Sequence, residues 1–474
     1  MLFNSVDFAV FLPIVFILYW FVFSKKAVQQ NAVILIASYV FYGFWDWRFL
    51  ILILFSSIVD FLIGKKLGEI SNVSKRKLLI TISIVINLGL LGFFKYYNFF
   101  LDSFTAAFTF FGSSISADRL NIILPVGISF YTFQTLSYSI DVYRKKLEPT
   151  PNFLAFSSFV SFFPQLVAGP IERATNLLPQ FYKKRIFSYD KAVSGVQLIV
   201  WGFFKKIVIA DNASIIVNGI FNNYENQSFE SLLIGAFLFS FQIYGDFSGY
   251  SDIAIGTARL FNIDLMTNFK FPYLSKNIGE FWKRWHISLS TWFRDYVYIP
   301  LGGSKGTLLK SIRNVGVVFI VSGFWHGANW TFIFWGFMHA VLYIPLFIAI
   351  KKRKTEVKKS NAIVNGFKIV STFILVMFSW IVFRSLTITD AFNYISRIIT
   401  FSTGGDFYAS TSKYLIITGI TFCSIFFLIA TEFYNDKKGR VETYFNSYFL
   451  ILLCLLTAFL GAIKNHADFI YFQF

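Results

Sequence analysis

Long apolar runs recur from one end of the chain to the other, and they constrain the fold more than any other feature. An α-helix needs about 20 predominantly apolar residues to cross the hydrocarbon core of a bilayer, and in lipid it satisfies its own backbone hydrogen bonds. Only 14% of the 474 residues are charged, against about 25% in ordinary soluble domains. The mean hydropathy is +0.60. We therefore expect an all-α polytopic membrane protein.

Several of the apolar runs are shorter than a perpendicular membrane helix requires, so some helices should be short, re-entrant or sheltered by their neighbours. We expect roughly 11–13 membrane helices in all. No internal repeat, low-complexity tract or soluble domain interrupts the runs. The sequence therefore predicts one integral-membrane domain over residues 1–474, with the polar motifs concentrated in a core at about 122–345.

The formal net charge of +18 could suggest nucleic-acid binding, but the positions of the basic residues argue otherwise. They cluster in short loops between apolar runs, for example at Lys25-Lys26, at Lys65-Lys66 and from Lys351 to Lys354. This pattern follows the positive-inside rule. We expect a multi-pass membrane protein that contacts lipid, with both termini outside and no nucleic-acid partner.

Two of the four histidines lie in dense polar and aromatic motifs: His286 in FWKRWHISLS and His326 in SGFWHGANW. A histidine is costly to bury among apolar residues without a task or a hydrogen-bonded partner. Glycines beside His326 permit close approach of a substrate, and a neutral imidazole is suited to take a proton near pH 7. The pair suggests proton chemistry; the alternative is that both bond backbone carbonyls in a helix bundle.

The segment Phe281–Tyr296 has apolar residues at three- and four-residue spacing, which predicts a helix with one broad apolar stripe. Its other face would carry Lys283, His286, Ser290 and Arg294 toward a basic, polar lumen. Such a lumen suits an anionic or phosphate-bearing donor. The alternative is an interfacial amphipathic helix whose Lys and Arg face lipid headgroups.

Two carboxylates, Asp246 and Asp252, lie in YGDFSGYSDIAIG. At ~100° per residue they would point about 240° apart on a helix, so they do not form an acid–base pair. We expect each to orient a histidine or an arginine, or to cap a broken helix.

The sequence gives no sign of a bound metal or cofactor. No paired-cysteine or His-x-x-x-His spacing predicts a metal site, and LGGSKGTLLK lacks the spacing of a phosphate-binding loop. A different class of function, a proton-coupled transporter, would use Asp141, Asp246, Asp252, His286 and His326 as a relay. Many transporters show repeated halves, and none is visible here.

Taken together and in order, five stretches resemble the membrane-bound O-acyltransferase (MBOAT) family, and most closely its bacterial alginate O-acetyltransferase branch. They are LPVGISFYTFQTLSYSIDVYR, FFPQLVAGPIER, YGDFSGYSDIAIG, FWKRWHISLSTWFRDYVYIPLGG and SGFWHGANW. The resemblance implies an O-acyltransferase built as a helical bundle around a central tunnel. It implies that acetyl-CoA, or another acyl thioester, enters from the cytoplasm as the donor substrate. His326 would be the general base or proton shuttle, and His286 would position the donor or stabilise the oxyanion.

Further expectations accompany this resemblance. The acceptor would be an exported or cell-envelope polysaccharide such as alginate, with peptidoglycan O-acetylation and D-alanyl transfer to teichoic acid as alternatives. A periplasmic or extracellular SGNH-type transferase or esterase would be the partner. The expected donor-binding or tunnel-lining residues are Lys283, Ser290, Arg294, Asp246, Asp252, Asn329 and Trp325.

The chain ends in ADFIYFQF, which resembles the acyl-carrying tyrosine motif of the small membrane partner in the D-alanylation system. Tyr471 could receive the acyl group and relay it to an extracytoplasmic transferase. The alternative is that Tyr471 and the neighbouring phenylalanines form an interfacial aromatic anchor.

Overall fold

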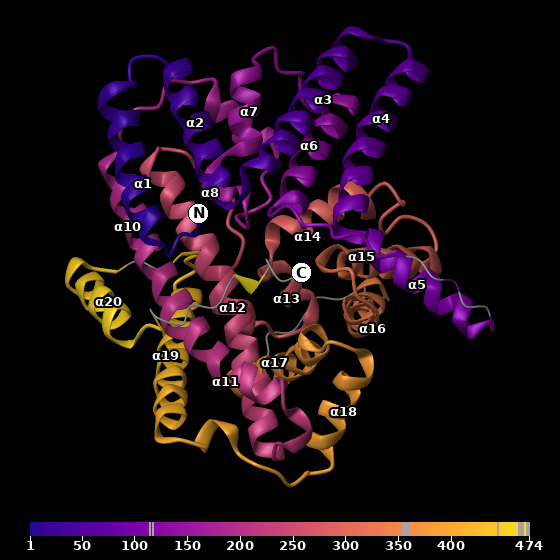
Figure 1. Ribbon diagram of the computed structural model, residues 1–474, viewed down its shortest axis with the longest axis vertical. Helices are drawn as coiled ribbons and strands as arrows, with labels where there is room; N and C mark the ends of the chain where they lie inside the picture. The colour runs from indigo at the N-terminus through magenta and orange to yellow at the C-terminus, as the bar shows by residue number, and fades with distance from the viewer. Residues whose placement is uncertain (113–114, 116–117, 353–360, 443–444, 463–468, 471–474) are drawn as a thin grey trace. The chain divides into compact units, whose positions relative to one another are not determined.

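The computed structural model describes residues 1–112, 115, 118–352, 361–442, 445–462 and 469–470 (Figure 1). Every regular element longer than an isolated bridge in these residues is a helix, which confirms the all-α prediction. Eight helical runs within them are long and apolar enough to cross a membrane, and two shorter apolar helices flank them at Val6–Val22 and Ser447–Leu460. The chain is therefore a multi-pass membrane protein.

The described residues pack as two compact units. The first comprises Met1–Val196 with Ala254–Met266, and the second comprises Gln197–Ile253 with Thr267–Phe474. Two of the boundaries fall inside helices, α10 (Tyr189–Phe203) and α12 (Phe229–Leu260). The expectation of one integral-membrane domain stays a prediction.

The first unit contains the long helices of the N-terminal part of the chain and several short ones. Its helices are α1 (Val6–Ile17), α2 (Ala27–Asp46), α3 (Leu50–Glu69), α4 (Val73–Leu91), α5 (Tyr97–Phe110), α6 (Ile128–Tyr143), α7 (Phe153–Ser161), α8 (Phe163–Leu166) and α9 (Ala174–Leu177). Helices α3, α4 and α6 lie side by side (Figure 1). The short helices α7 to α9 occupy the proline-containing stretch between the long ones.

A buried carboxylate joins α3, α4 and α6. Asp60 of α3 is fully buried and accepts hydrogen bonds from Ser83 Oγ of α4 at 2.5 Å and Ser139 Oγ of α6 at 2.6 Å. Its second oxygen accepts from Asn87 Nδ2 of α4 at 2.7 Å. In a membrane interior, such interhelical bonds select one packing arrangement, because a lipid chain cannot replace a polar partner.

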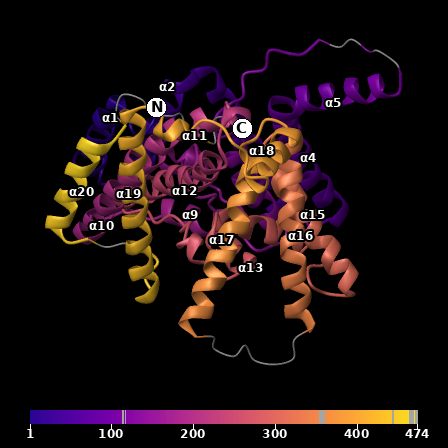
Figure 2. The same ribbon diagram turned by 90° about the horizontal axis from the view of Figure 1, so that it is seen from below.

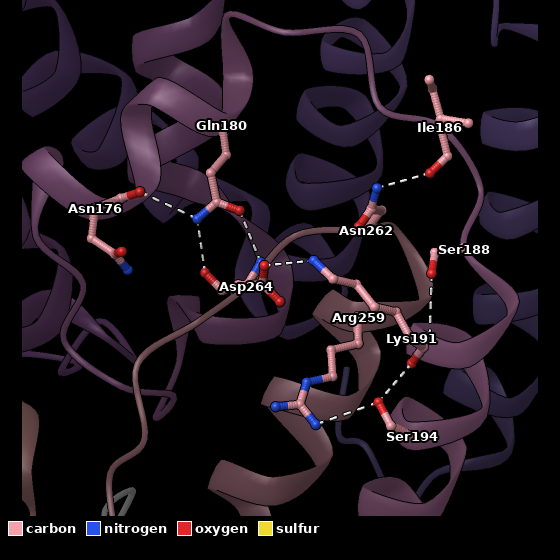
Figure 3. A network of polar contacts seen from close by, with 9 residues as sticks. All are labelled: Asn176, Gln180, Ile186, Ser188, Lys191, Ser194, Arg259, Asn262 and Asp264. Atoms are coloured by element: carbon pink, nitrogen blue, oxygen red, sulfur yellow. Dashed lines mark hydrogen bonds and ion pairs between the residues drawn. The ribbon is translucent and has the colours of Figure 1, made fainter.

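A second polar network in the first unit fixes the end of α12 and the residues after it (Figure 3). Gln180 bonds the main chain of Asp264 twice, donating to its carbonyl oxygen and accepting from its N–H at 2.9 Å each. The Asp264 carboxylate pairs with Lys191 Nζ at 2.6 Å, and Asn262 donates to the carbonyl oxygen of Ile186. These groups are solvent-exposed, so each bond contributes little to stability, but together they fix the path of the chain.

The second unit contains the motifs that the sequence analysis singled out. Its helices are α11 (Asp211–Phe221), most of α12, α13 (Ile278–Arg284), α14 (Ile287–Phe293), α15 (Leu308–His326), α16 (Trp330–Lys352), α17 (Ala362–Arg384), α18 (Ile388–Ile399), α19 (Ser412–Lys437) and α20 (Ser447–Leu460). Helix α15 packs along α16, and α17 lies against α16 (Figure 2).

Helices α15 and α16 approach each other closely at two glycines. A Cβ atom on Gly323 would collide with the carbonyl oxygen of Phe332, and one on Gly336 would collide with that of Phe319. Small residues at such a crossing let two membrane helices pack backbone to backbone. The crossing fixes the C-terminal end of α15, where His326 lies.

The Asp60 cluster predicts a clear difference between two substitutions. Asp60→Leu should lower the free energy of unfolding by about 1–3 kcal/mol, because three buried donors lose their acceptor. Asp60→Asn keeps one acceptor oxygen and should lower the free energy of unfolding by less. Denaturant titration in detergent micelles would measure both, with Asp102→Leu, at an exposed carboxylate of α5, as the control. An equal loss of unfolding free energy in Asp60→Leu and Asp102→Leu would contradict the role of Asp60 in helix packing.

Candidate active site

The predicted helix over Phe281–Tyr296 is broken in its middle. Helix α13 ends at Arg284, Trp285 is extended, and α14 begins only at Ile287. Between them His286 has φ 43° and ψ 54°, in the left-handed region. The expectation of one continuous helix is wrong, and a non-glycine residue in this conformation is a strained feature typical of functional sites.

Backbone hydrogen bonds to a neighbouring segment, residues 268–270, accompany the break. The N–H of Lys270 donates to the carbonyl oxygen of Arg284 at 2.9 Å, and the N–H of Ile287 donates to the carbonyl oxygen of Asn268 at 2.8 Å. These bonds replace helical ones on both sides of His286. Apolar periodicity cannot reveal such a break, because it reports side-chain spacing and not the backbone partners of a distant segment.

The His286 side chain is enclosed by aromatic residues and one amide. Its relative exposure is 0%, and the edge of its ring meets Phe247 of α12 with the ring centroids 4.6 Å apart. Its Nδ1 lies 3.0 Å from Oδ1 of Asn268. Burial, and secondarily the nearby His326, hold the pKa of His286 well below its ordinary value. His286 is therefore neutral at physiological pH.

His326 lies at the C-terminal end of α15 in a similar aromatic enclosure. It is 3% exposed. Its ring centroid lies 5.1 Å from that of Trp325, 5.2 Å from that of Trp335 and 5.6 Å from that of Phe383. Trp325 also faces His286, at 6.1 Å. The structure therefore gathers the two predicted histidines around one tryptophan.

A cavity of about 410 Å³ adjoins the two histidine segments. It is lined by three of the predicted donor-binding residues, Lys283, Ser290 and Arg294. It also reaches Ile287, next to His286, and Ser322, about one helical turn before His326. The predicted common face is thus correct for Lys283, Ser290 and Arg294 but wrong for His286, which the broken backbone turns toward Asn268.

Asp246 and Asp252 lie on α12 and pair with lysines. Lys206 Nζ lies 2.6 Å from Asp246 and 2.8 Å from Asp211, and Lys205 Nζ lies 2.7 Å from Asp252. Each carboxylate thus has a lysine partner, and the expectation that Asp246 and Asp252 orient a histidine or an arginine, or cap a broken helix, stays a prediction. Lys205 and Lys206 went unnoticed as partners, although two lysines inside the apolar run FFKKIVIA are a signal of buried ion pairing.

Asp246 also holds the last described residues of the chain. Its Oδ2 accepts a hydrogen bond from the N–H of Ile470 at 2.7 Å. The ring of Phe469 packs against Tyr250 and Phe247, with centroids 4.8 and 6.0 Å apart. Phe247 is the residue that meets His286. Tyr471 and His466 lie outside the described residues.

The other predicted residues have structural contacts. Asn329 donates to the carbonyl oxygen of Leu386 at 3.0 Å and accepts from the N–H of Thr331, so its amide joins the start of α16 to the end of α17. His339 lies 3.1 Å from Ser379 Oγ and 3.3 Å from Trp282 Nε1. The residues that line the cavity do not include Asn329. Within the described part of the chain, no group of three or more histidine, cysteine or acidic residues could hold a metal.

Comparison with known proteins identifies the family. The model of MBOAT, the membrane-bound O-acyltransferase family, matches residues 143–387. A probable alginate O-acetylase of Pseudomonas aeruginosa is 39% identical, over 84% of this chain and 75% of its own, and one of Pseudomonas putida is 35% identical over 99% of both. A peptidoglycan O-acetyltransferase of Helicobacter pylori is 36% identical, over 72% of this chain and 69% of its own. The chain belongs to the membrane-bound O-acyltransferase family and is an O-acyltransferase.

Proposed function

We propose that the protein transfers acetyl groups from acetyl-CoA across the membrane for O-acetylation of an exported or cell-envelope polysaccharide. The alginate O-acetylases among its relatives support a polysaccharide acceptor such as alginate. The Helicobacter relative supports peptidoglycan as an alternative acceptor. The other alternative is D-alanyl transfer to teichoic acid. Family membership supports an enzyme and not the proton-coupled transporter.

One observation supports this function best: two buried histidines share an aromatic enclosure beside a cavity that carries cations. Buried imidazoles supply proton transfer where water is excluded. Lys283 and Arg294 at the cavity supply positive charge for an anionic donor. Acyl transfer from a coenzyme A thioester to a hydroxyl needs both functions.

In the proposed reaction His326 is the general base. Its imidazole accepts the proton of the acceptor hydroxyl while the hydroxyl oxygen attacks the thioester carbonyl carbon. The tetrahedral intermediate collapses, the carbon–sulfur bond breaks, and the imidazolium returns the proton to the departing thiolate. The products are an O-acetyl ester and free coenzyme A. His286 is proposed to position the donor or to stabilise the oxyanion.

The cavity is the proposed donor site. Lys283 and Arg294 are exposed at its lining and can reach the phosphates of coenzyme A, whereas Ser290 is partly buried. In this proposal the cavity opens to the cytoplasm, which fits basic loops on the cytoplasmic side and both termini outside. The protein would lie in the bacterial cytoplasmic membrane. The partner that completes transfer would be an SGNH-type enzyme in the periplasm or outside the cell.

Tyr471 is a proposed relay for the acyl group. Support comes from the motif FIYFQF and from the residues immediately before it, since Ile470 is bonded to Asp246 and Phe469 packs on Phe247 next to His286. A phenol can carry an acyl group as an ester and pass it to a second enzyme.

Substitution of the proposed base tests the assignment. His326→Ala should lower acetyl transfer from radiolabelled acetyl-CoA to polysaccharide in membranes by a factor on the order of 10²–10⁴, because proton abstraction is lost. His339→Gln is the matched control, since it removes another buried histidine, whose ring nitrogens contact Ser379 Oγ and Trp282 Nε1. An undiminished rate in His326→Ala would exclude it as the base.

The donor site can be tested with two donors. Lys283→Ala and Arg294→Ala should each raise KM for acetyl-CoA by roughly fivefold, the effect of about 1 kcal/mol from an exposed charge pair. With acetyl-pantetheine, which lacks the nucleotide phosphates, the variants should match the wild type. A KM change that is equal for both donors would favour the alternative in which these side chains face headgroups.

The relay is tested by Tyr471→Phe, which removes only the hydroxyl. Polysaccharide acetylation in cells should fall to background, whereas Tyr448→Phe, an exposed tyrosine of α20, should have no effect. Full acetylation in Tyr471→Phe would remove the relay and leave an aromatic anchor.

A further inference from the structure

Asn268 was not among the predicted site residues, and its side chain makes a polar contact with the ring of His286. Both side chains are fully buried. Oδ1 of Asn268 lies 3.0 Å from Nδ1 of His286. The main chain of Asn268 also accepts the N–H of Ile287 at 2.8 Å, so the residue binds this turn with its backbone and with its side chain.

The contacts identify the amide atom that faces His286. The same atom lies 2.9 Å from Ser288 Oγ and receives the backbone N–H of Ser288 at 3.4 Å. A backbone N–H can only donate, so the atom it points to must be the amide oxygen. The amide nitrogen then donates in the other direction, to Ser251 Oγ at 3.2 Å. The orientation of this amide therefore follows from its hydrogen-bonded neighbours.

An amide oxygen can only accept, so Nδ1 of His286 must carry a proton. A neutral imidazole has one N–H, and burial together with His326 keeps His286 neutral, as its lowered pKa shows. The single proton therefore lies on Nδ1, and Nε2 holds the lone pair. Nε2 in this state can accept a proton but cannot donate a hydrogen bond to an oxyanion.

We propose that Asn268 is a positioning residue that fixes His286 in the Nδ1–H tautomer, so that its Nε2 presents a lone pair, and not an N–H, to the acyltransfer site. This inference rests on the proposed function for its catalytic meaning. It bears on one of the two roles expected for His286, which were to position the donor or to stabilise the oxyanion: an imidazole without a proton on Nε2 does not stabilise the oxyanion from that atom. A carbonyl or carboxylate on the far nitrogen of a reactive histidine acts in the same way in many enzymes.

The surroundings of His286 are consistent with a neutral imidazole. His326 is the titratable side chain that acts on it from α15. On α12 the charged residues on either side of Phe247, Asp246 and Asp252, are paired with Lys206 and Lys205. In the segment of residues 268–270, Asn268 itself is uncharged. The contact at Nδ1 is thus made by an uncharged amide, which determines the tautomer.

The tautomer can be measured directly, independently of activity. The chain has four histidines, so ¹⁵N-histidine labelling of the full protein in micelles gives few signals, and loss of one set in His286→Gln assigns them. At pH 7.5 we expect His286 to show a protonated Nδ1 and an unprotonated Nε2. A protonated Nε2, or an imidazolium, would overturn the inference. This readout remains valid even if the donor is not acetyl-CoA.

Two variants of Asn268 test the link to catalysis. In Asn268→Leu, His286 should no longer be held in the Nδ1–H tautomer. We expect kcat to fall by a factor on the order of 10² or more, with little change in KM for acetyl-CoA. Asn268→Asp keeps an acceptor at the same place and should restore activity. Its negative charge should also raise the pKa of His286 and move the acidic limb of the pH–rate profile to higher pH.

Asn314→Leu is the matched control, because Asn314 is buried in the same unit and donates to the carbonyl oxygens of Leu301 and Gly303. It should lower stability without changing the His286 signals. A purely structural role for Asn268 would appear as equal losses of kcat in Asn268→Leu and Asn314→Leu with an unchanged tautomer, and that result would overturn the proposal.

Discussion

The hydrogen bonds of Asn268 to the turn at residues 286–288 are the interaction on which the arrangement of the site depends. Together with the bond from the N–H of Lys270 to the carbonyl oxygen of Arg284, they separate α13 from α14 and accompany a left-handed conformation at His286 that an uninterrupted helix would not allow. A continuous helix would place His286 on the same face as Lys283 and Ser290. The break instead turns the imidazole into an aromatic enclosure and leaves the basic residues along the cavity. The residues proposed for catalysis and those proposed for anion binding are thereby separated within one short segment.

Buried charge in the second unit is balanced by specific partners. Lys206 lies between Asp211 and Asp246, and Lys205 pairs with Asp252. Removing one member of such a pair strands a charge in an apolar interior, which costs about 3–5 kcal/mol. Asp246 has a second partner in the N–H of Ile470, so the same carboxylate connects the ion pairs to the end of the chain. The proposed relay at Tyr471 would begin directly after this anchored residue.

The sequence predicted the helical membrane fold, the two histidine motifs and the grouping of Lys283, Ser290 and Arg294. These features depend on local periodicity and composition, which a single chain displays directly. It did not predict the break at His286 or the role of Asn268, because both depend on backbone bonds between segments that are separate in the sequence. The lysine partners of Asp246 and Asp252 were not predicted for the same reason, since residues on different helices are brought together only by packing. Asp60 went unnoticed because one carboxylate in an apolar run has no motif around it.

The central claim is that this unit cleaves an acyl thioester at a site formed by His286, His326 and the basic cavity. The most direct measurement is the release of free coenzyme A thiol from acetyl-CoA by the purified protein in proteoliposomes, with acetyl-CoA supplied on the face of Lys283 and Arg294. The account predicts protein-dependent thiol release, at least one equivalent per site, when donor is added on that face and not on the other. The claim would be contradicted if no thiol were released with acetyl-CoA added on either face, even with the polysaccharide and an SGNH-type partner present.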